Sequence, residues 1–109
     1  MKMTCAILLL CSIAPLSMEA RAGSGGGAIS QMLFMPNGAV LVYLNSPLSG
    51  LASCSTAERF AVNANNDVGK AQLAGLLMAH ANRRPVQIYG SGQCDAWGDT
   101  ESVSYFVLP

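Results

Sequence analysis

From residue 28 onward, apolar residues fall into short runs separated by turn residues, which predicts a mainly β domain. The runs 28–35 and 39–44 flank a Pro-Asn-Gly turn at 36–38. This arrangement predicts a β-hairpin, because Asn and Gly readily adopt the positive φ that tight turns need. Both runs are largely apolar on both faces, so we expect both strands to be covered on each side.

A third strand and a helix are predicted next. In the run 59–64, Phe60 and Val62 share one face, which is typical of a half-buried strand. Polar residues at 65–67 then provide N-cap chemistry, and apolar residues at three-four spacing predict a helix of about 15 residues. Pro85 lies beyond its end, where a proline commonly follows a helix.

Two short strands, at 86–89 and 102–108, complete the pattern. The order strand, strand, strand, helix, strand, strand is that of a small five-stranded OB-like barrel, a mainly β (α+β) fold whose closed sheet leaves few exposed edges. We therefore predict a single OB-like domain over 28–109. Residues 23–27 are nearly all glycine, and we expect them to form a flexible lead-in because ordering glycine costs the most backbone entropy.

The first 22 residues have the pattern of a secretory signal peptide. Lys2 supplies a positive start, an apolar run covers 6–14, and Ala20-Arg21-Ala22 forms a small-x-small cleavage site before Gly23. We therefore expect cleavage between Ala22 and Gly23, and a periplasmic or secreted protein.

Two alternatives to cleavage are disfavoured by particular residues. The longer apolar stretch from Ala6 to Leu16 contains Pro15 and is shorter than the roughly 20 residues of a spanning helix, so we expect no permanent membrane anchor. A lipoprotein signal needs a small residue before its cysteine, whereas Leu10 precedes Cys11.

Only Cys54 and Cys94 remain after the predicted cleavage, in a compartment that permits oxidation. They predict one disulfide bond, which would contribute roughly 4 kcal/mol in the loop-entropy model. Two free buried thiols are the alternative. A redox pair is disfavoured, because catalytic dithiols usually form a Cys-x-x-Cys motif at the start of a helix.

The charge balance disfavours nucleic acid as a partner. Six basic and six acidic residues give a formal net charge of zero. A nucleic-acid binder needs a concentrated basic field, whereas only Arg83-Arg84 is locally basic, and it lies at the predicted helix end.

The segments 59–62, 69–71, 76–79 and 86–94 together resemble a group of small exported bacterial proteins, mostly uncharacterised. They share a cysteine before the third strand, a helix, and a strand that ends in Gly-x-Gly-x-Cys. More distantly, the element order is similar to the B subunits of AB5 toxins of the subtilase and pertussis kinds. These are OB-like domains that form pentameric rings and bind cell-surface glycans. The resemblance implies glycan binding and self-association, but no toxin sugar-binding motif matches this chain, and no site is carried over from it.

The loop before the last strand carries the candidate ligand-binding residues. Asp95 and Asp99, with Glu101 nearby, could hold Ca²⁺ or hydrogen-bond sugar hydroxyls while the indole of Trp97 stacks on a ring. A solvated acidic turn, with Trp97 packed against the disulfide, is the simpler interpretation of the same residues.

No catalytic constellation is visible in the sequence. His80 is the only histidine, without a nucleophile and an acid to form a set, so packing at the helix end is the better account of it. We expect no enzyme activity, no cofactor and no metal. The leading hypothesis is an exported non-enzymatic binding or assembly module that recognises a glycan or protein and self-associates. The alternative is a structural or accessory envelope protein without a small-molecule ligand.

Overall fold

The computed structural model describes residues 22–109, so most of the predicted signal peptide, residues 1–21, lies outside the described residues. The described chain contains five strands and one helix. In chain order these are β1 (Ser24–Phe34), β2 (Ala39–Leu44), β3 (Phe60–Asn63), α2 (Asp67–Ala81), β4 (Pro85–Gly90) and β5 (Glu101–Val107).

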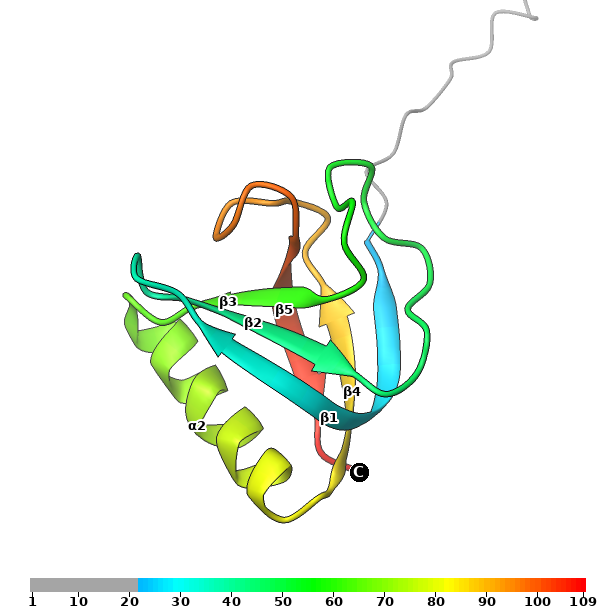
Figure 1. Cartoon of the computed structure of the whole chain (residues 1–109), viewed down its shortest axis with the longest axis vertical. Coiled ribbons are helices and arrows are strands. Elements are labelled where there is room, and N and C mark those ends of the chain that lie inside the picture. The colour runs from blue at the N-terminus through cyan, green and yellow to red at the C-terminus, as the bar shows by residue number, and fades with distance from the viewer. Residues whose placement is uncertain (1–21) are drawn as a thin grey trace, which may run out of the picture.

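The five strands close into a barrel in the order β1-β2-β3-β5-β4 (Figure 1). Strand β1 makes closure possible because it is long enough to pair twice, with β4 through residues 24–28 and with β2 through residues 29–34. On the far side of the ring, β3 pairs with β5 in parallel. The predicted five-stranded barrel, with its helix between the third and fourth strands, is confirmed.

The glycine-rich segment is ordered, so the prediction of a flexible lead-in over 23–27 was wrong. Residues 24–27 form the first part of β1 and pair with β4. Close packing explains why glycines stand here: a Cβ at Gly25 would collide with the side chain of Leu48, and one at Gly23 would lie 2.8 Å from the Cα of Leu51. The hydrogen bonds of the sheet offset the entropy that these glycines lose on ordering.

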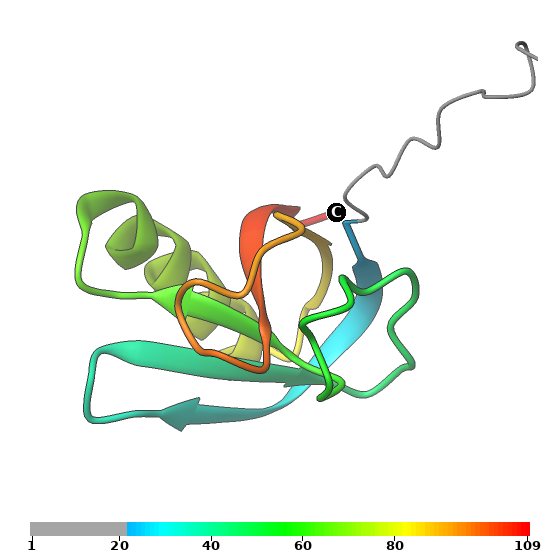
Figure 2. The ribbon, with the colours of Figure 1, turned by 90° about the horizontal axis from the view of Figure 1, so that it is seen from above.

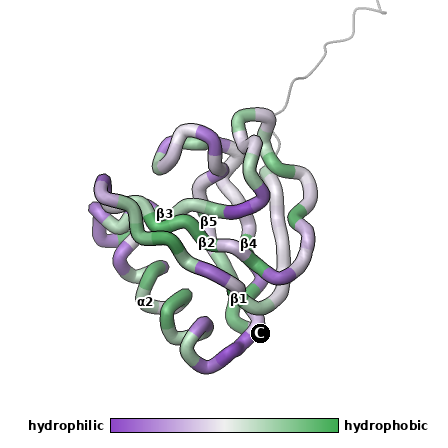
Figure 3. The backbone as a smooth tube through the Cα atoms, in the orientation of Figure 1, coloured by the Kyte–Doolittle hydropathy of each residue, from purple (hydrophilic) through white to green (hydrophobic). Residues whose placement is uncertain are grey.

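The core lies between the barrel strands and the helix. Apolar residues gather on β2, β3 and α2 (Figure 3), and the residues of the buried cluster come from every strand but β5 and from the helix. They are Ile29, Val40, Val42, Phe60, Val62, Leu76, Ala79, Val86 and Ile88.

The two hairpin strands differ in how they are covered. Residues 39–42 of β2 are all buried, as expected for a strand covered on both faces. The end of β1 is not covered in this way, since Phe34 is 60% exposed. The expectation was therefore right for β2 and wrong for the second half of β1, which extends past the packed part of the barrel toward the 36–38 turn.

Helix α2 has the predicted length and boundaries, but Val68, one of the apolar residues at three-four spacing, is not buried. Asn66 is its N-cap, Asn82 is its C-cap, and the helix has 15 residues. Leu76 and Ala79 pack into the barrel, whereas Val68 is 68% exposed. The helix lies along one side of the barrel, opposite the 45–59 loop (Figure 2).

The predicted disulfide bond is confirmed. Cys54 and Cys94 are bonded, with their Cα atoms 6.2 Å apart. The bond links the loop before β3 to the loop after β4, as expected. A disulfide of this kind indicates an oxidising compartment.

Candidate functional site

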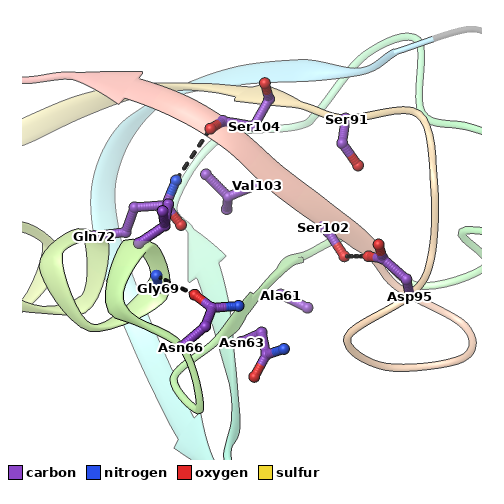
Figure 4. Close-up of a pocket in the computed structure, with 11 residues that line it drawn as sticks. Ala61, Asn63, Asn66, Gly69, Gln72, Ser91, Asp95, Ser102, Val103 and Ser104 are labelled. Carbon is purple, nitrogen blue, oxygen red and sulfur yellow. Dashed lines mark hydrogen bonds between the residues drawn. The ribbon is translucent and has the colours of Figure 1, made fainter.

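A polar cavity of about 440 Å³ opens between the start of α2 and the paired strands β3 and β5. Figure 4 shows side chains from the helix, from both strands and from the loop after β4 around one space. Most of them carry amide, hydroxyl or carboxylate groups. The polar side chains are those of Asn63, Asn66, Gln72, Ser91, Asp95, Ser102 and Ser104.

The helix start positions the first wall of the cavity. Asn66 uses its Oδ1 to accept a hydrogen bond of 2.7 Å from the backbone N–H of Gly69, which satisfies a free donor of the first helical turn. A Cβ at Gly69 would overlap the backbone carbonyl of Asn63, so glycine is required for the helix to begin this close to β3. The cap leaves Nδ2 of Asn66 without a partner among residues 22–109 and available to a ligand.

Strand β5 supplies the opposite wall. The Oγ of Ser102 donates to Oδ1 of Asp95 and accepts a hydrogen bond of 3.2 Å from the N–H of Ala96. Farther along the strand, Nε2 of Gln72 donates to the carbonyl of Ser104 at 3.0 Å. These contacts hold the side chains of Asp95 and Gln72 in place. Oδ2 of Asp95 and Oε1 of Gln72 are left without partners in the described part of the chain.

The disulfide bond holds the third wall in place. Cys94 immediately precedes Asp95, and its bond to Cys54 ties this loop to the loop before β3. The Asp95–Ser102 hydrogen bond then anchors the loop to β5 (Figure 4). The cavity is thus bounded by one helix start, two strands and one cross-linked loop, which together fix the positions of its polar groups.

The lining carries one acidic side chain, Asp95, and no basic one. An anionic ligand such as a phosphate would need a positive group or several converging N–H donors. The amides and hydroxyls that are present can both donate and accept hydrogen bonds. This chemistry suits a neutral ligand with many hydroxyl groups.

The three predicted ligand-binding residues are separated in the structure. Asp95 lines the cavity, whereas Trp97 and Asp99 are not among its lining residues. Trp97 is half-buried and forms a bridge with Thr100, whose N–H donates to the Trp97 carbonyl at 3.0 Å. It therefore takes part in a tight turn before β5.

Asp99 belongs to a cluster around Arg59. The guanidinium of Arg59 donates to Oδ1 of Asp99 at 3.0 Å, to the hydroxyl of Tyr43 at 2.6 Å and to Oγ1 of Thr100 at 2.8 Å. A hydrogen bond from the Thr100 hydroxyl, followed by that from Arg59, lowers the pKa of Asp99. Burial opposes the charge on Arg59, but its hydrogen bonds to Tyr43 and Asp99 raise its pKa overall. The cluster joins the ends of β2, β3 and β5.

Glu101, which the sequence places near the acidic loop, points into the protein. Its side chain is fully buried and accepts hydrogen bonds from the backbone N–H groups of Gly23, Ala52 and Gly92 at 3.0, 2.8 and 2.8 Å. Sequence reasoning missed this role because a glutamate at the start of a strand normally indicates a solvated position.

A second cavity, of about 420 Å³, lies at the far end of the helix and is lined by His80 and Arg83 together with Ala28, Ile29 and Ala81. His80 lies in the last turn of α2, as expected. Across residues 22–109 no group of three or more His, Cys, Asp or Glu residues could hold a metal ion.

Sequence reasoning also missed the amide residues of the first cavity. In the sequence, Asn63 belongs to the third predicted strand and Asn66 to the capping segment 65–67, and no pattern singles out Gln72. One signal was available, since Ser102 and Ser104 alternate with apolar residues along the last strand and so share one face. That they face the helix start depends on the barrel order and was not predictable from spacing.

The part of the chain from residue 22 to 109 contains no helix that is both long and apolar enough to cross a membrane. Comparison with known proteins found no matching family model, no matching curated protein and no matching solved structure.

Proposed function

We propose that this protein is an exported, non-enzymatic binding module that holds a neutral, hydroxyl-rich ligand, such as a glycan, in the cavity between α2, β3 and β5. The observation that carries the proposal is the lining itself. Amide, hydroxyl and carboxylate groups from separate elements face one space, those of Asn66, Gln72 and Asp95 are each held by a hydrogen bond within the protein, and several of the polar atoms have no partner in residues 22–109.

Preorganisation supports binding at this site. The side chains of Asn66, Gln72 and Asp95 are each fixed by one hydrogen bond within the protein and each keep a second polar atom for a ligand. Binding therefore orders these side chains little further, and the loss of side-chain entropy on binding is small. The predicted signal peptide and the disulfide bond support work in the periplasm or outside the cell.

The experiment that tests the proposal is a glycan array probed with the exported protein, followed by calorimetry with any sugar that binds. Asp95→Asn should weaken binding about tenfold or more, because a hydrogen bond to a charged group contributes about 1.5–3 kcal/mol. Glu58→Gln is the matched control, since it makes the same chemical change at an exposed loop position outside the cavity lining. Equal affinities for the two variants would contradict the cavity as the site.

The 95–99 loop is the competing location, and two variants distinguish it. If Trp97→Ala and Asp99→Asn abolish binding while Asp95→Asn with an intact fold does not, the ligand is held by the loop. If no glycan binds and the protein is a monomer, a structural or accessory envelope role replaces the proposal.

Self-association is a second candidate, favoured by the outer face of β4 and β5. Tyr89 and Tyr105 stack there with ring centroids 4.7 Å apart, and Tyr105 and Val107 remain 55% and 45% exposed. Contact with a second copy of the chain would cover these residues. Light scattering should show an oligomer that Tyr105→Ser weakens, and a wild-type monomer at high concentration would contradict it.

A further inference from the structure

The buried carboxylate of Glu101 lacks a cationic partner among residues 22–109, where the single ion pair is that of Arg59 and Asp99. It is surrounded by three backbone N–H donors, which satisfy its oxygens but carry no net charge. A carboxylate removed from water is costly unless it is paired with a positive group as well as hydrogen-bonded. One of its three donors can become such a group.

That donor is the N–H of Gly23, which lies 3.0 Å from Oε2 of Glu101. Gly23 is buried, whereas Ala22 before it is exposed. The carbonyl of Gly23 also accepts a hydrogen bond of 2.8 Å from the N–H of Gly90. Gly23, the residue that follows the predicted cleavage site, is thus held through both its N–H and its carbonyl.

We infer that cleavage between Ala22 and Gly23 completes this site, because the new α-ammonium group of Gly23 becomes the counter-ion of the buried Glu101 carboxylate. Water attacks the carbonyl carbon of Ala22, the C–N bond to Gly23 breaks, and Ala22 leaves as a carboxylate. The proton released by the new carboxyl group goes to the Gly23 amine, which therefore carries a positive charge. The inference rests on the predicted export signal and is independent of the proposed ligand site.

The surroundings of Gly23 suit an ammonium group. One N–H bond points to Glu101, and because Ala22 is exposed, the other hydrogens face the side where water can solvate them. Only glycine fits at this position, because a Cβ would lie 2.8 Å from the Cα of Leu51. Processing adds a Coulomb attraction between opposite charges, at a buried position, to a hydrogen bond that the carboxylate already accepts, so it should stabilise the barrel.

The first test is chemical and uses the full chain exported with its own leader. Intact mass should give Gly23 as the first residue, and a different N-terminus would overturn the inference. The processed chain then contains two amines, the α-amine of Gly23 and the side chain of exposed Lys70. Acetic anhydride at neutral pH should acetylate Gly23 at least about tenfold more slowly in the folded protein than in urea, with Lys70 as internal reference.

The second test separates charge from burial. Inserting one alanine between Ala22 and Gly23 moves the ammonium one residue outward and turns the Gly23 nitrogen back into a neutral amide. The structure already accommodates an alanine before Gly23, so the insertion adds no clash. It should lower Tm by about 4–8 °C.

The same insertion in a Glu101→Gln background should have less than about half of that effect, because the ionic partner is gone. Equal effects in both backgrounds would overturn the ion pair. If Glu101→Gln does not fold, acetylation decides: the inserted alanine's amine should react freely, and equal protection of it and of wild-type Gly23 would overturn the inference.

Discussion

The carboxylate of Glu101 occupies the space that a side chain at Gly90 would need. A Cβ at Gly90 would overlap Oε2 of Glu101 and would lie 3.0 Å from the ring of Phe60. The carboxylate cannot move aside without losing its backbone donors, which come from three separate segments of the chain. Gly90 and Glu101 therefore form one packing unit between adjacent strands.

Gly90→Ala should therefore destabilise the protein by about 1–3 kcal/mol, because overpacking forces either the carboxylate or the strand to shift. Urea unfolding measures the change. Gly98→Ala is the matched control, since a Cβ there has no neighbour within 4 Å, and it should change stability by less than about 0.5 kcal/mol. Similar losses for both variants would contradict the close packing of Glu101 against Gly90.

Removing the disulfide bond should cost about 4 kcal/mol, because the bond restricts the unfolded chain across 40 positions. This is a large part of the stability of a domain of this size. The double variant Cys54→Ala/Cys94→Ala should match the reduced wild-type protein in urea unfolding. A loss below about 1 kcal/mol in both would show that the loops are held by other contacts.

Acid should weaken the Arg59 cluster through Asp99. The hydrogen bonds from Thr100 and Arg59 lower the pKa of Asp99 in the folded protein below the ordinary value of about 3.9. The stabilisation is therefore complete above that value and is lost as the pH falls through the lower, folded pKa. Wild type should have a higher Tm than Asp99→Asn at pH 6, and the difference should shrink below about pH 4. A difference that is the same at pH 3 and pH 6 would contradict this role.

Local chemistry accounts for what could be predicted of the fold from the sequence. Asn37 and Gly38 specify the hairpin turn, where Gly38 has a φ of 93°, and Asn66 specifies the helix start. Predicting the disulfide bond required only the number of cysteines that remain after the predicted cleavage and an oxidising compartment. These features depend on a few neighbouring residues, and they appear in the structure where they were expected.

The rest depended on contacts between distant residues. The glycines of 23–27 form a strand because Leu48, Leu51 and β4 approach them closely, and nothing in their own composition indicates those partners. Glu101 is buried because Gly23, Ala52 and Gly92 converge on it from three segments. The polar cavity likewise arises from the parallel pairing of β3 with β5, which spacing along the chain does not specify.

Asn66 offers a way to separate folding from binding, since Oδ1 caps the helix and Nδ2 has no partner in the described part of the chain. Asn66→Ser keeps a good N-cap and removes the amide, so stability should change by less than about 0.5 kcal/mol while affinity for the bound glycan falls several-fold. Asn66→Ala removes both groups and should also cost about 1 kcal/mol of stability. Urea unfolding and calorimetry on the same preparations measure the two effects. Wild-type affinity in Asn66→Ser would remove this amide from the site, because the helix start would then serve the fold alone.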